Sequence, residues 1–145
     1  MKDFIYLLNI SFILIAAGTQ RLTKETYNDY INNNRVVLLK YTTTWCTYCN
    51  IINNLFTGLQ SALIRENINC ALAIVDGDES PELIKEHKVN YYPDVRLIVD
   101  GVVYKFTWEH NVDNLIKFIK HGIDTNPIKD IKQFTADTSS ALKVL

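Results

Sequence analysis

The sequence has little net charge, few cysteines and only one long apolar run. Its 145 residues include 15 basic and 16 acidic side chains, which leaves a formal net charge of −1. A nucleic-acid-binding protein usually shows a basic patch, and no long run of lysine or arginine is present here. We therefore exclude nucleic acid as a partner. The length and the composition, with nearly half of the residues hydrophobic, fit one globular domain.

The one long apolar run lies near the amino terminus, from Phe4 to Ala17. A run of about 14 residues is short of the roughly 20 that a membrane-spanning helix needs, whereas it suits the core of a secretory signal peptide. We predict a signal peptide over residues 1–18, cleaved after Ala17 or Gly18, and no membrane span after cleavage. An uncleaved anchor or a buried first helix is the alternative, because Lys2 is offset by a neighbouring aspartate.

The rest of the sequence alternates helical and strand-like patterns. Amphipathic spacing and helix-start signals predict helices over residues 24–31, 46–66, 80–87 and 112–121. Short β-branched and apolar runs predict strands over residues 36–42, 71–75, 95–99 and 102–106. Between the last two strands lies Asp100-Gly101, a strong hairpin signal. Thr23 is the expected cap of the first helix, and Gly122 is the expected stop of the last one.

This order predicts an α/β fold with a mixed central sheet and helices on both faces. A βαβ unit supplies the parallel part of the sheet, and the β-hairpin and a C-terminal helix follow it. We expect one domain over residues 19–123. Residues 124–145, in which the apolar periodicity weakens, are expected to form a C-terminal extension, either a mobile tail or a short docking segment.

Cys46 and Cys49 form a Cys-x-x-Cys pair where a helix is expected to begin. The first N–H groups of a helix have no partner within the helix, and the helix dipole is positive there. Both effects favour a thiolate, which is the nucleophile in disulfide exchange. We therefore expect Cys46 to be an exposed nucleophile and Cys49, one turn later, to be the more buried resolving cysteine.

A zinc site is the alternative interpretation of a single Cys-x-x-Cys pair. Zinc needs four ligands, but Cys70 is the only other cysteine, and His87, His110 and His121 are scattered along the sequence. The secretory context also favours disulfide chemistry, so we expect neither a metal nor an organic cofactor. Cys70 itself is expected to be an inert buried thiol, with a regulatory or intermolecular disulfide as the alternative.

Two segments resemble a known family. Leu38–Cys49 is similar to the strand and the Trp-Cys-Gly-His-Cys active site of the thioredoxin superfamily, and most closely to a catalytic domain of the protein disulfide isomerase family. Val89–Leu97 resembles the Val-x-Gly-Tyr-Pro-Thr segment of the same family. The two motifs occur in the family's order, and the resemblance covers about Leu22–Ile123. It implies a thioredoxin-like fold.

The resemblance also implies that the Tyr92–Pro93 bond is cis and faces the cysteines. A cis X–Pro bond is about 0.5–1 kcal/mol less favourable than trans, and the backbone beside it can pair with an extended substrate. The alternative is a trans proline at a strand start. We expect Trp45, Tyr92 and Pro93 to bind substrate, although ordinary packing is a second interpretation of Trp45.

The sequence departs from the family pattern at Lys40, where the family carries a buried carboxylate that exchanges a proton with the second cysteine. A cation there favours thiolates, but it accepts a proton only if desolvation lowers its own pKa. We therefore predict slower resolution of mixed disulfides. The alternative is that Lys40 extends to the sheet edge. Thr47 and Tyr48 replace the family's Gly-His, which removes a cation that stabilises the thiolate.

Together these features predict an enzyme, a thiol–disulfide oxidoreductase or isomerase resembling protein disulfide isomerase. Its substrates would be polypeptides with thiols or disulfides, with a redox partner protein, in the endoplasmic reticulum lumen or outside the cell. One alternative is a thioredoxin-like reductant. Another is a non-catalytic polypeptide-binding adaptor module, in which the cysteines form a nearly inert structural disulfide.

Overall fold

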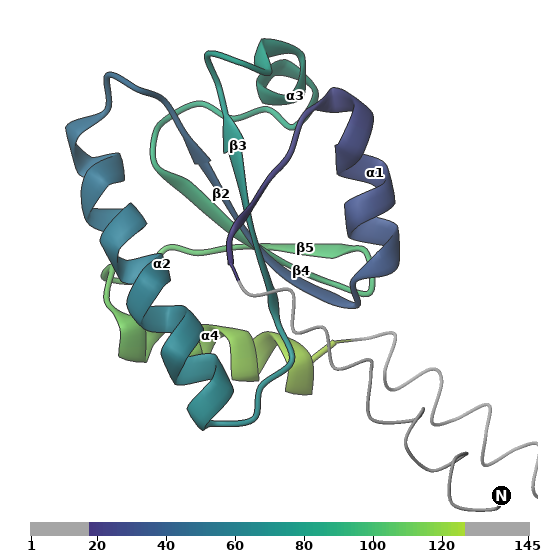
Figure 1. The fold of residues 1–145 in the computed structure, drawn as a ribbon. Helices are drawn as coiled ribbons and strands as arrows, with labels where there is room; N and C mark the ends of the chain where they lie inside the picture. The colour runs from purple at the N-terminus through teal and green to yellow at the C-terminus, as the bar shows by residue number, and fades with distance from the viewer. Residues whose placement is uncertain (1–17, 127–145) are drawn as a thin grey trace, which may run out of the picture.

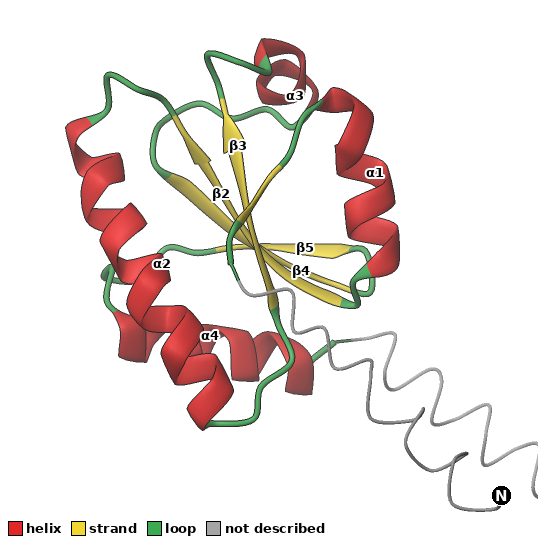
Figure 2. Ribbon diagram, viewed as in Figure 1, coloured by secondary structure: helices red, strands yellow, loops and turns green. Residues whose placement is uncertain are grey.

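A five-stranded sheet forms the centre of the protein in the computed structural model, which describes residues 18–126. Its strands are β1 (Gln20–Arg21), β2 (Val36–Thr42), β3 (Ala71–Asp76), β4 (Asp94–Val99) and β5 (Val102–Lys105). They lie in the order β1-β3-β2-β4-β5 (Figure 2). The first three strands in that order are parallel, and β4 and β5 are antiparallel to their neighbours, which confirms the expected mixed sheet.

Four helices cover the two faces of the sheet (Figure 1). They are α1 (Lys24–Asn33), α2 (Thr47–Arg65), α3 (Pro81–Glu86) and α4 (Val112–Asp124). The helices α2 and α4 pack on one face, and α1 and α3 pack on the other. The α/β fold that the element order predicts, with helices on both faces of the sheet, is therefore confirmed, as is the thioredoxin-like fold that the resemblance implies.

The central strand β2 explains why the protein has two apolar cores. Successive side chains of a strand point to opposite faces, and every residue of β2 is buried. Val36 and Leu38 face the core under α2 and α4, whereas Val37, Leu39 and Tyr41 face the core under α1 and α3. A strand covered on both faces has a nearly continuous apolar sequence, and β2 has one except at Lys40 and at the terminal Thr42.

Local signals place several element boundaries as expected. Thr23 precedes α1, and its backbone N–H donates to Thr26 Oγ1 at 2.9 Å. Pro81 occupies the start of α3, where its missing N–H costs no hydrogen bond. At the hairpin tip, Asp100 and Gly101 have φ angles of 49° and 81°, as a tight turn between twisted strands requires. These boundaries follow from residues that lie close in sequence.

Two features differ from the sequence-based expectation. Strand β1 was not predicted, because Gln20 and Arg21 are exposed and polar, and the strand exists only through pairing with β3. Helix α4 continues past Gly122 to Asp124, so the glycine does not end the helix. A Cβ atom at Gly122 would overlap the side chain of Leu97, so close packing of α4 on β4 is the reason for glycine here.

The predicted signal peptide lies outside the described residues except for Gly18, and the predicted C-terminal extension lies mostly outside them. Within residues 18–126, no helix is both long enough and apolar enough to cross a membrane.

Candidate active site

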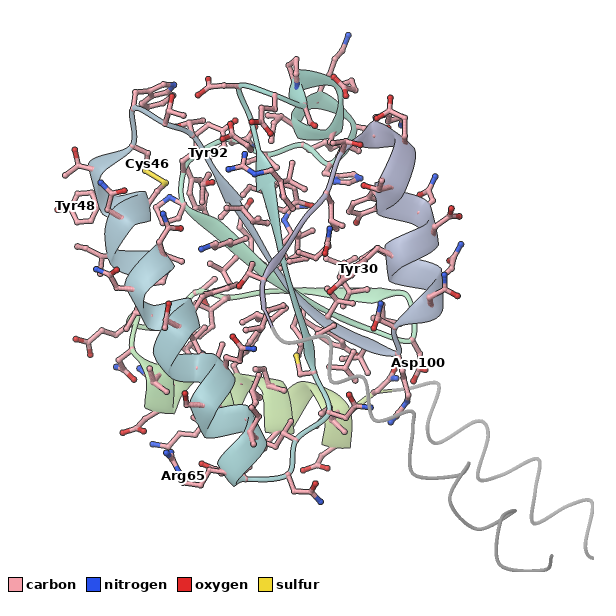
Figure 3. All side chains as sticks on the ribbon, in the orientation of Figure 1. Tyr30, Cys46, Tyr48, Arg65, Tyr92 and Asp100 are labelled. Atoms are coloured by element: carbon pink, nitrogen blue, oxygen red, sulfur yellow. A yellow bond between two sulfur atoms is a disulfide. The ribbon has the colours of Figure 1, made fainter. Side chains whose placement is uncertain are left out.

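Cys46 and Cys49 form a disulfide at the amino end of α2. Cys46 is the N-cap residue, and its sulfur accepts a hydrogen bond from the backbone N–H of Cys49 at 3.1 Å. Figure 3 shows the disulfide at this end of α2, with Tyr48 pointing outward and Tyr92 on the other side of Cys46. A negative charge on Cys46 in the reduced state would therefore be stabilised by a backbone donor and by the helix dipole.

The two sulfurs differ in accessibility. Cys46 keeps 8% of its surface exposed, and Cys49 keeps 1%. The expectation of an exposed Cys46 is wrong for the disulfide form, in which this residue is buried. The order of accessibility nevertheless agrees with an attacking first cysteine and a resolving second one.

Aromatic side chains stand beside the disulfide. Trp45 is 71% exposed, and its ring meets the ring of Tyr92 edge to face, with 5.8 Å between the centroids. The Tyr92–Pro93 bond is cis. The Tyr92 hydroxyl reaches the backbone at Gly77, where a Cβ atom would overlap it. Trp45 is thus a surface residue held by Tyr92, and it is not part of either apolar core.

A groove of about 460 Å³ lies beside Tyr48, the residue that precedes Cys49. Helix α2 contributes Tyr48 and Ile51, which are 73% and 52% exposed. The segment that leads into β4 contributes Tyr91, Tyr92 and Pro93. The groove therefore brings together Tyr48 from between the two cysteines and the predicted cis-proline segment, which lies more than forty residues later in the sequence.

The loop after β5 adds two groove residues that the sequence reasoning did not place in the site, Glu109 and His110. His110 packs against the ring of Phe106, with 5.5 Å between the centroids. Burial lowers the pKa of His110 below its ordinary value, so its imidazole is neutral at neutral pH. His110 therefore adds no positive charge at neutral pH, and Glu109 is the acidic residue among those that line the groove.

Lys40 lies beneath α2 in the centre of the sheet. It is 3% exposed, its Nζ donates to Asn53 Oδ1 at 2.5 Å, and it sits 4.4 Å from the centroid of the Phe56 ring. No carboxylate in residues 18–126 forms an ion pair with it. Desolvation lowers the pKa of Lys40 to about 8. Because β2 is flanked by β3 and β4, Lys40 does not extend to a sheet edge.

Asn53 is a site neighbour that sequence reasoning missed. It lies four residues after Cys49, so the two residues share a face of α2. That spacing is the one signal that could have linked Asn53 to the cysteines. Thr47 and Tyr48, the residues between the cysteines, are exposed at the first turn of α2.

The loop before Cys46 is held by Asp78, another residue that the sequence did not indicate. The Asp78 carboxylate accepts hydrogen bonds from the Thr44 N–H at 3.1 Å and from Thr44 Oγ1 at 2.8 Å. These bonds from Thr44 lower the pKa of Asp78. The neighbouring Gly77 N–H donates to Thr42 O at 2.7 Å. The loop after β3 thereby fixes the loop that carries Trp45.

No group of three or more histidine, cysteine or acidic side chains in the described part of the chain is arranged to hold a metal ion. Cys70, the remaining cysteine, lies far from the site, just before β3. Cys70 is only partly buried and borders a pocket, so the expected fully buried thiol is wrong in this respect. Its Sγ contacts Ala71 O at 3.6 Å, and desolvation raises the pKa of its thiol to about 12.

A disulfide at a helix start, a cis proline in the groove that Tyr48 also lines, and a mixed sheet of this topology define the class of thioredoxin-fold proteins with a Cys-x-x-Cys site. The family model described as Thioredoxin matches residues 18–121. The chain therefore belongs to the thioredoxin family.

Curated relatives place it near the protein disulfide isomerases. The chain is 27% identical over 136 residues to Protein disulfide-isomerase 1 of Caenorhabditis elegans, an alignment that covers 90% of this chain and 28% of that protein. It is 30% identical over 91 residues to Protein disulfide-isomerase of Humicola insolens, covering 63% of this chain and 18% of that protein. The chain thus spans less than a third of the length of these relatives.

Solved structures agree with the fold. The first thioredoxin domain of mouse Protein disulfide-isomerase A4 matches with a TM-score of 0.65 and 16% identity, covering 73% of this chain and 76% of that chain. Human ERp44 matches with a TM-score of 0.66 and 20% identity, covering 72% of this chain and 32% of that chain.

Proposed function

We propose that this protein is a thiol–disulfide oxidoreductase that acts on cysteines of polypeptides. The observation that carries the proposal is the Cys46–Cys49 disulfide at the amino end of α2, where the Cys49 N–H donates to the Cys46 sulfur. A sulfur in this position is stabilised as a thiolate and is therefore a better nucleophile at neutral pH.

The chemistry needs only the two cysteines and a substrate disulfide. In the reduced protein, the Cys46 thiolate attacks one substrate sulfur, which forms a mixed disulfide and releases the other substrate sulfur as a thiolate. Cys49 then loses its proton and attacks the Cys46 sulfur. The Cys46–Cys49 disulfide forms, and the substrate leaves as a second thiolate. The protein is oxidised by two electrons and the substrate is reduced by two, and the reverse sequence oxidises a substrate dithiol.

Trp45, Tyr92 and Pro93 are proposed to hold the substrate across the cysteines. The cis bond before Pro93 and the edge-to-face contact of Trp45 with Tyr92 support this assignment. An extended polypeptide can bind there through its backbone, and the exposed aromatic rings offer apolar contact area.

Lys40 is proposed to tune the proton transfer of the resolving step. Its low pKa, caused by desolvation, lets a fraction of Lys40 accept a proton near neutral pH. Replacing Lys40 by glutamate restores the family's acidic group and should raise the pKa values of the reduced cysteines. The test is the pH profile of thiol alkylation in wild type and Lys40→Glu, and an unchanged profile contradicts the assignment.

Thr47 and Tyr48, between the two cysteines, supply no cation that would stabilise the thiolate of the reduced protein. We therefore expect the Cys46–Cys49 disulfide to be a weaker oxidant of substrate thiols.

A location in the secretory pathway is part of the proposal. It is supported by the signal-peptide pattern before Gly18 and by a relative named Endoplasmic reticulum resident protein 44 of Bos taurus, 22% identical over 133 residues, which covers 88% of this chain and 32% of that protein. A redox partner protein that restores the starting oxidation state would act there.

The direct test is the reduction of an insulin-type disulfide substrate by wild type and by Cys46→Ser. The wild type should accelerate reduction, and the variant should not, because it lacks the attacking thiolate. Equal activity of both proteins contradicts the proposal. Refolding of a protein with scrambled disulfides then distinguishes an isomerase, which restores native pairs, from a simple reductant.

A polypeptide-binding module is the second candidate. The 8% exposure of Cys46 favours it, because a covered disulfide reacts slowly with large substrates. This candidate predicts that Cys46→Ser still binds an unfolded polypeptide as tightly as wild type and that neither protein reduces the insulin-type substrate.

A further inference from the structure

Two carboxylates that form no ion pair within residues 18–126 lie near residues that neighbour the cysteines in the sequence. Glu109 lines the groove beside Tyr48 and Tyr91, and none of the ion pairs found within residues 18–126 includes it. Asp78 binds Thr44, next to Trp45, and likewise takes part in no ion pair of the described chain. Because no ion pair of the described chain cancels them, these charges attract an approaching cation, and water and salt screen the attraction.

The region around Tyr92 carries further negative charge. Asp76, at the end of β3, and Glu79 both pair with the same cation, Arg21, at 3.1 and 2.8 Å. Arg21 therefore pairs with two carboxylates, and Asp78 adds a third that takes part in no ion pair of the described chain. The pKa of Tyr92, whose ring contacts Trp45, is raised by burial first and by the charges of Asp78 and Asp76 next.

The nearby cations cancel only part of this field. Lys40 is buried beneath α2, and His110 is neutral at neutral pH. The one carboxylate of Asp94 pairs with Arg96 at 2.8 Å and with Lys105 at 3.6 Å, so it compensates only part of the charge of Lys105. Its Nζ also sits 4.3 Å from the centroid of the Tyr91 ring. A tyrosine of the groove therefore already binds an ammonium group in this structure.

We propose that the aromatic groove, with Glu109 and Asp78, selects polypeptide segments that carry lysine or arginine beside the reacting cysteine. This inference rests on the proposed function and names the substrate class of the same site.

The side chain of a lysine or arginine fits the composition of the groove. Its aliphatic stem can pack on Ile51 and the tyrosine rings while its charged end approaches Glu109. Such charge complementarity raises the rate of encounter with basic segments, and it disfavours acidic segments through repulsion. Glu109 is therefore a specificity-determining residue, and it takes no part in the exchange of sulfurs.

The test uses three synthetic peptides that differ only at the residues flanking one cysteine, which are lysine, norleucine or glutamate. Each peptide is supplied as a mixed disulfide with thiopyridine, and the release of thiopyridine by the reduced protein gives the second-order rate constant. Rates with dithiothreitol, a neutral dithiol, correct for the intrinsic reactivity of each peptide. At low ionic strength the lysine peptide should react about tenfold faster than the glutamate peptide, and the ratio should shrink in about 0.5 M salt.

Variants of Glu109 test whether the selectivity for basic peptides comes from the groove. Glu109→Gln should reduce the lysine-to-glutamate ratio about threefold, and Glu109→Lys should reduce it further. Asp29→Asn removes an exposed acidic charge on α1, on the opposite face of the sheet, and should leave the ratio unchanged. A ratio that is the same in wild type and both Glu109 variants overturns the inference but leaves the proposed function intact. If no peptide reacts, the proposed function fails, and the selectivity fails with it.

Discussion

Lys40 and Asn53 join the central strand to the helix that carries the cysteines: Lys40 Nζ donates to Asn53 Oδ1 at 2.5 Å, one helical turn beyond Cys49. The lysine is desolvated, and it has no acidic partner among the described residues. Its protonated form therefore destabilises the folded state, which gives the protein a pH-dependent stability.

The first prediction concerns this dependence in the disulfide form. The folded pKa of Lys40, about 8, is lower than its unfolded value of 10.5, so the unfolded chain binds more protons between these pH values. The contribution of Lys40 to stability therefore rises with pH, by about 2 kcal/mol between pH 7 and 9.5. Urea unfolding of wild type and Lys40→Met across this pH range measures the contribution. Groups other than Lys40 that titrate at high pH, such as the tyrosines, are present in both proteins, so they cancel in the difference between the two unfolding free energies. A difference that does not change with pH contradicts the prediction.

The second prediction concerns the order of reaction of the two active-site thiols. In the reduced protein, Cys46 should be alkylated at least about tenfold faster than Cys49, because its thiolate is stabilised at the helix start and its partner is almost fully buried. Mass spectrometry of peptides after brief treatment with iodoacetamide gives the ratio. A faster reaction of Cys49 would reverse the roles assigned to the pair.

The third prediction concerns Gly77, which faces Tyr92 and Thr43. A Cβ atom there would overlap the Tyr92 hydroxyl and lie 3.2 Å from Thr43 Cγ2, so Gly77→Ala should lower the unfolding free energy by about 1–3 kcal/mol. It should also slow insulin reduction, because Tyr92 supports Trp45. Removing the hydroxyl in Gly77→Ala/Tyr92→Phe should recover part of the stability.

Gly58→Ala is the matched control for this series. A Cβ atom at Gly58 meets only Val112 Cγ2, at an ordinary contact distance of 3.5 Å. Since alanine favours a helix interior over glycine, Gly58→Ala should stabilise the protein by about 0.5–1 kcal/mol. Equal effects at the two glycines would mean that contact with Tyr92 is not the cause.

The fourth prediction concerns Cys70. With a thiol pKa of about 12, less than about a thousandth of Cys70 is ionised at pH 8. In the disulfide form, where Cys70 is the one free cysteine, alkylation at pH 8 should be at least about a hundredfold slower in the native protein than in urea. Thiol counting under both conditions measures the ratio, and rapid native labelling would favour a regulatory role.

The sequence predicted those parts of the fold that depend on neighbouring residues. The hairpin follows from Asp100-Gly101, the start of α3 from Pro81, and the buried strand β2 from its own apolar run. Strand β1 escaped prediction because two exposed polar residues carry no strand pattern, and only the edge of β3 makes them a strand. Gly122 was predicted to end the last helix, because the residues around it in the sequence do not show that the side chain of Leu97 packs against it.

The same limit applies to the site. The cysteines and the cis proline belong to motifs that are local in sequence, whereas Asp78 and Glu109 reach the site only through the paths of their loops. Lys40 was identified because it occupies the position of the family's carboxylate. Its burial beneath α2 and its bond to Asn53 depend on the packing of the helix on the sheet, which no local sequence pattern encodes.

The boundaries of the described chain lie at the end of the domain opposite its reactive disulfide. Gly18 borders a pocket with Ile64 and Cys70 at the carboxyl end of α2, and Asn126 is tied to the hairpin by a hydrogen bond to Asp100 of 2.7 Å. A helix of 19 residues separates that end from Cys46 by about 28 Å. Gly18 and Asn126 therefore lie away from the disulfide, so a substitution at either residue should leave Trp45, Tyr92 and the cysteines unperturbed.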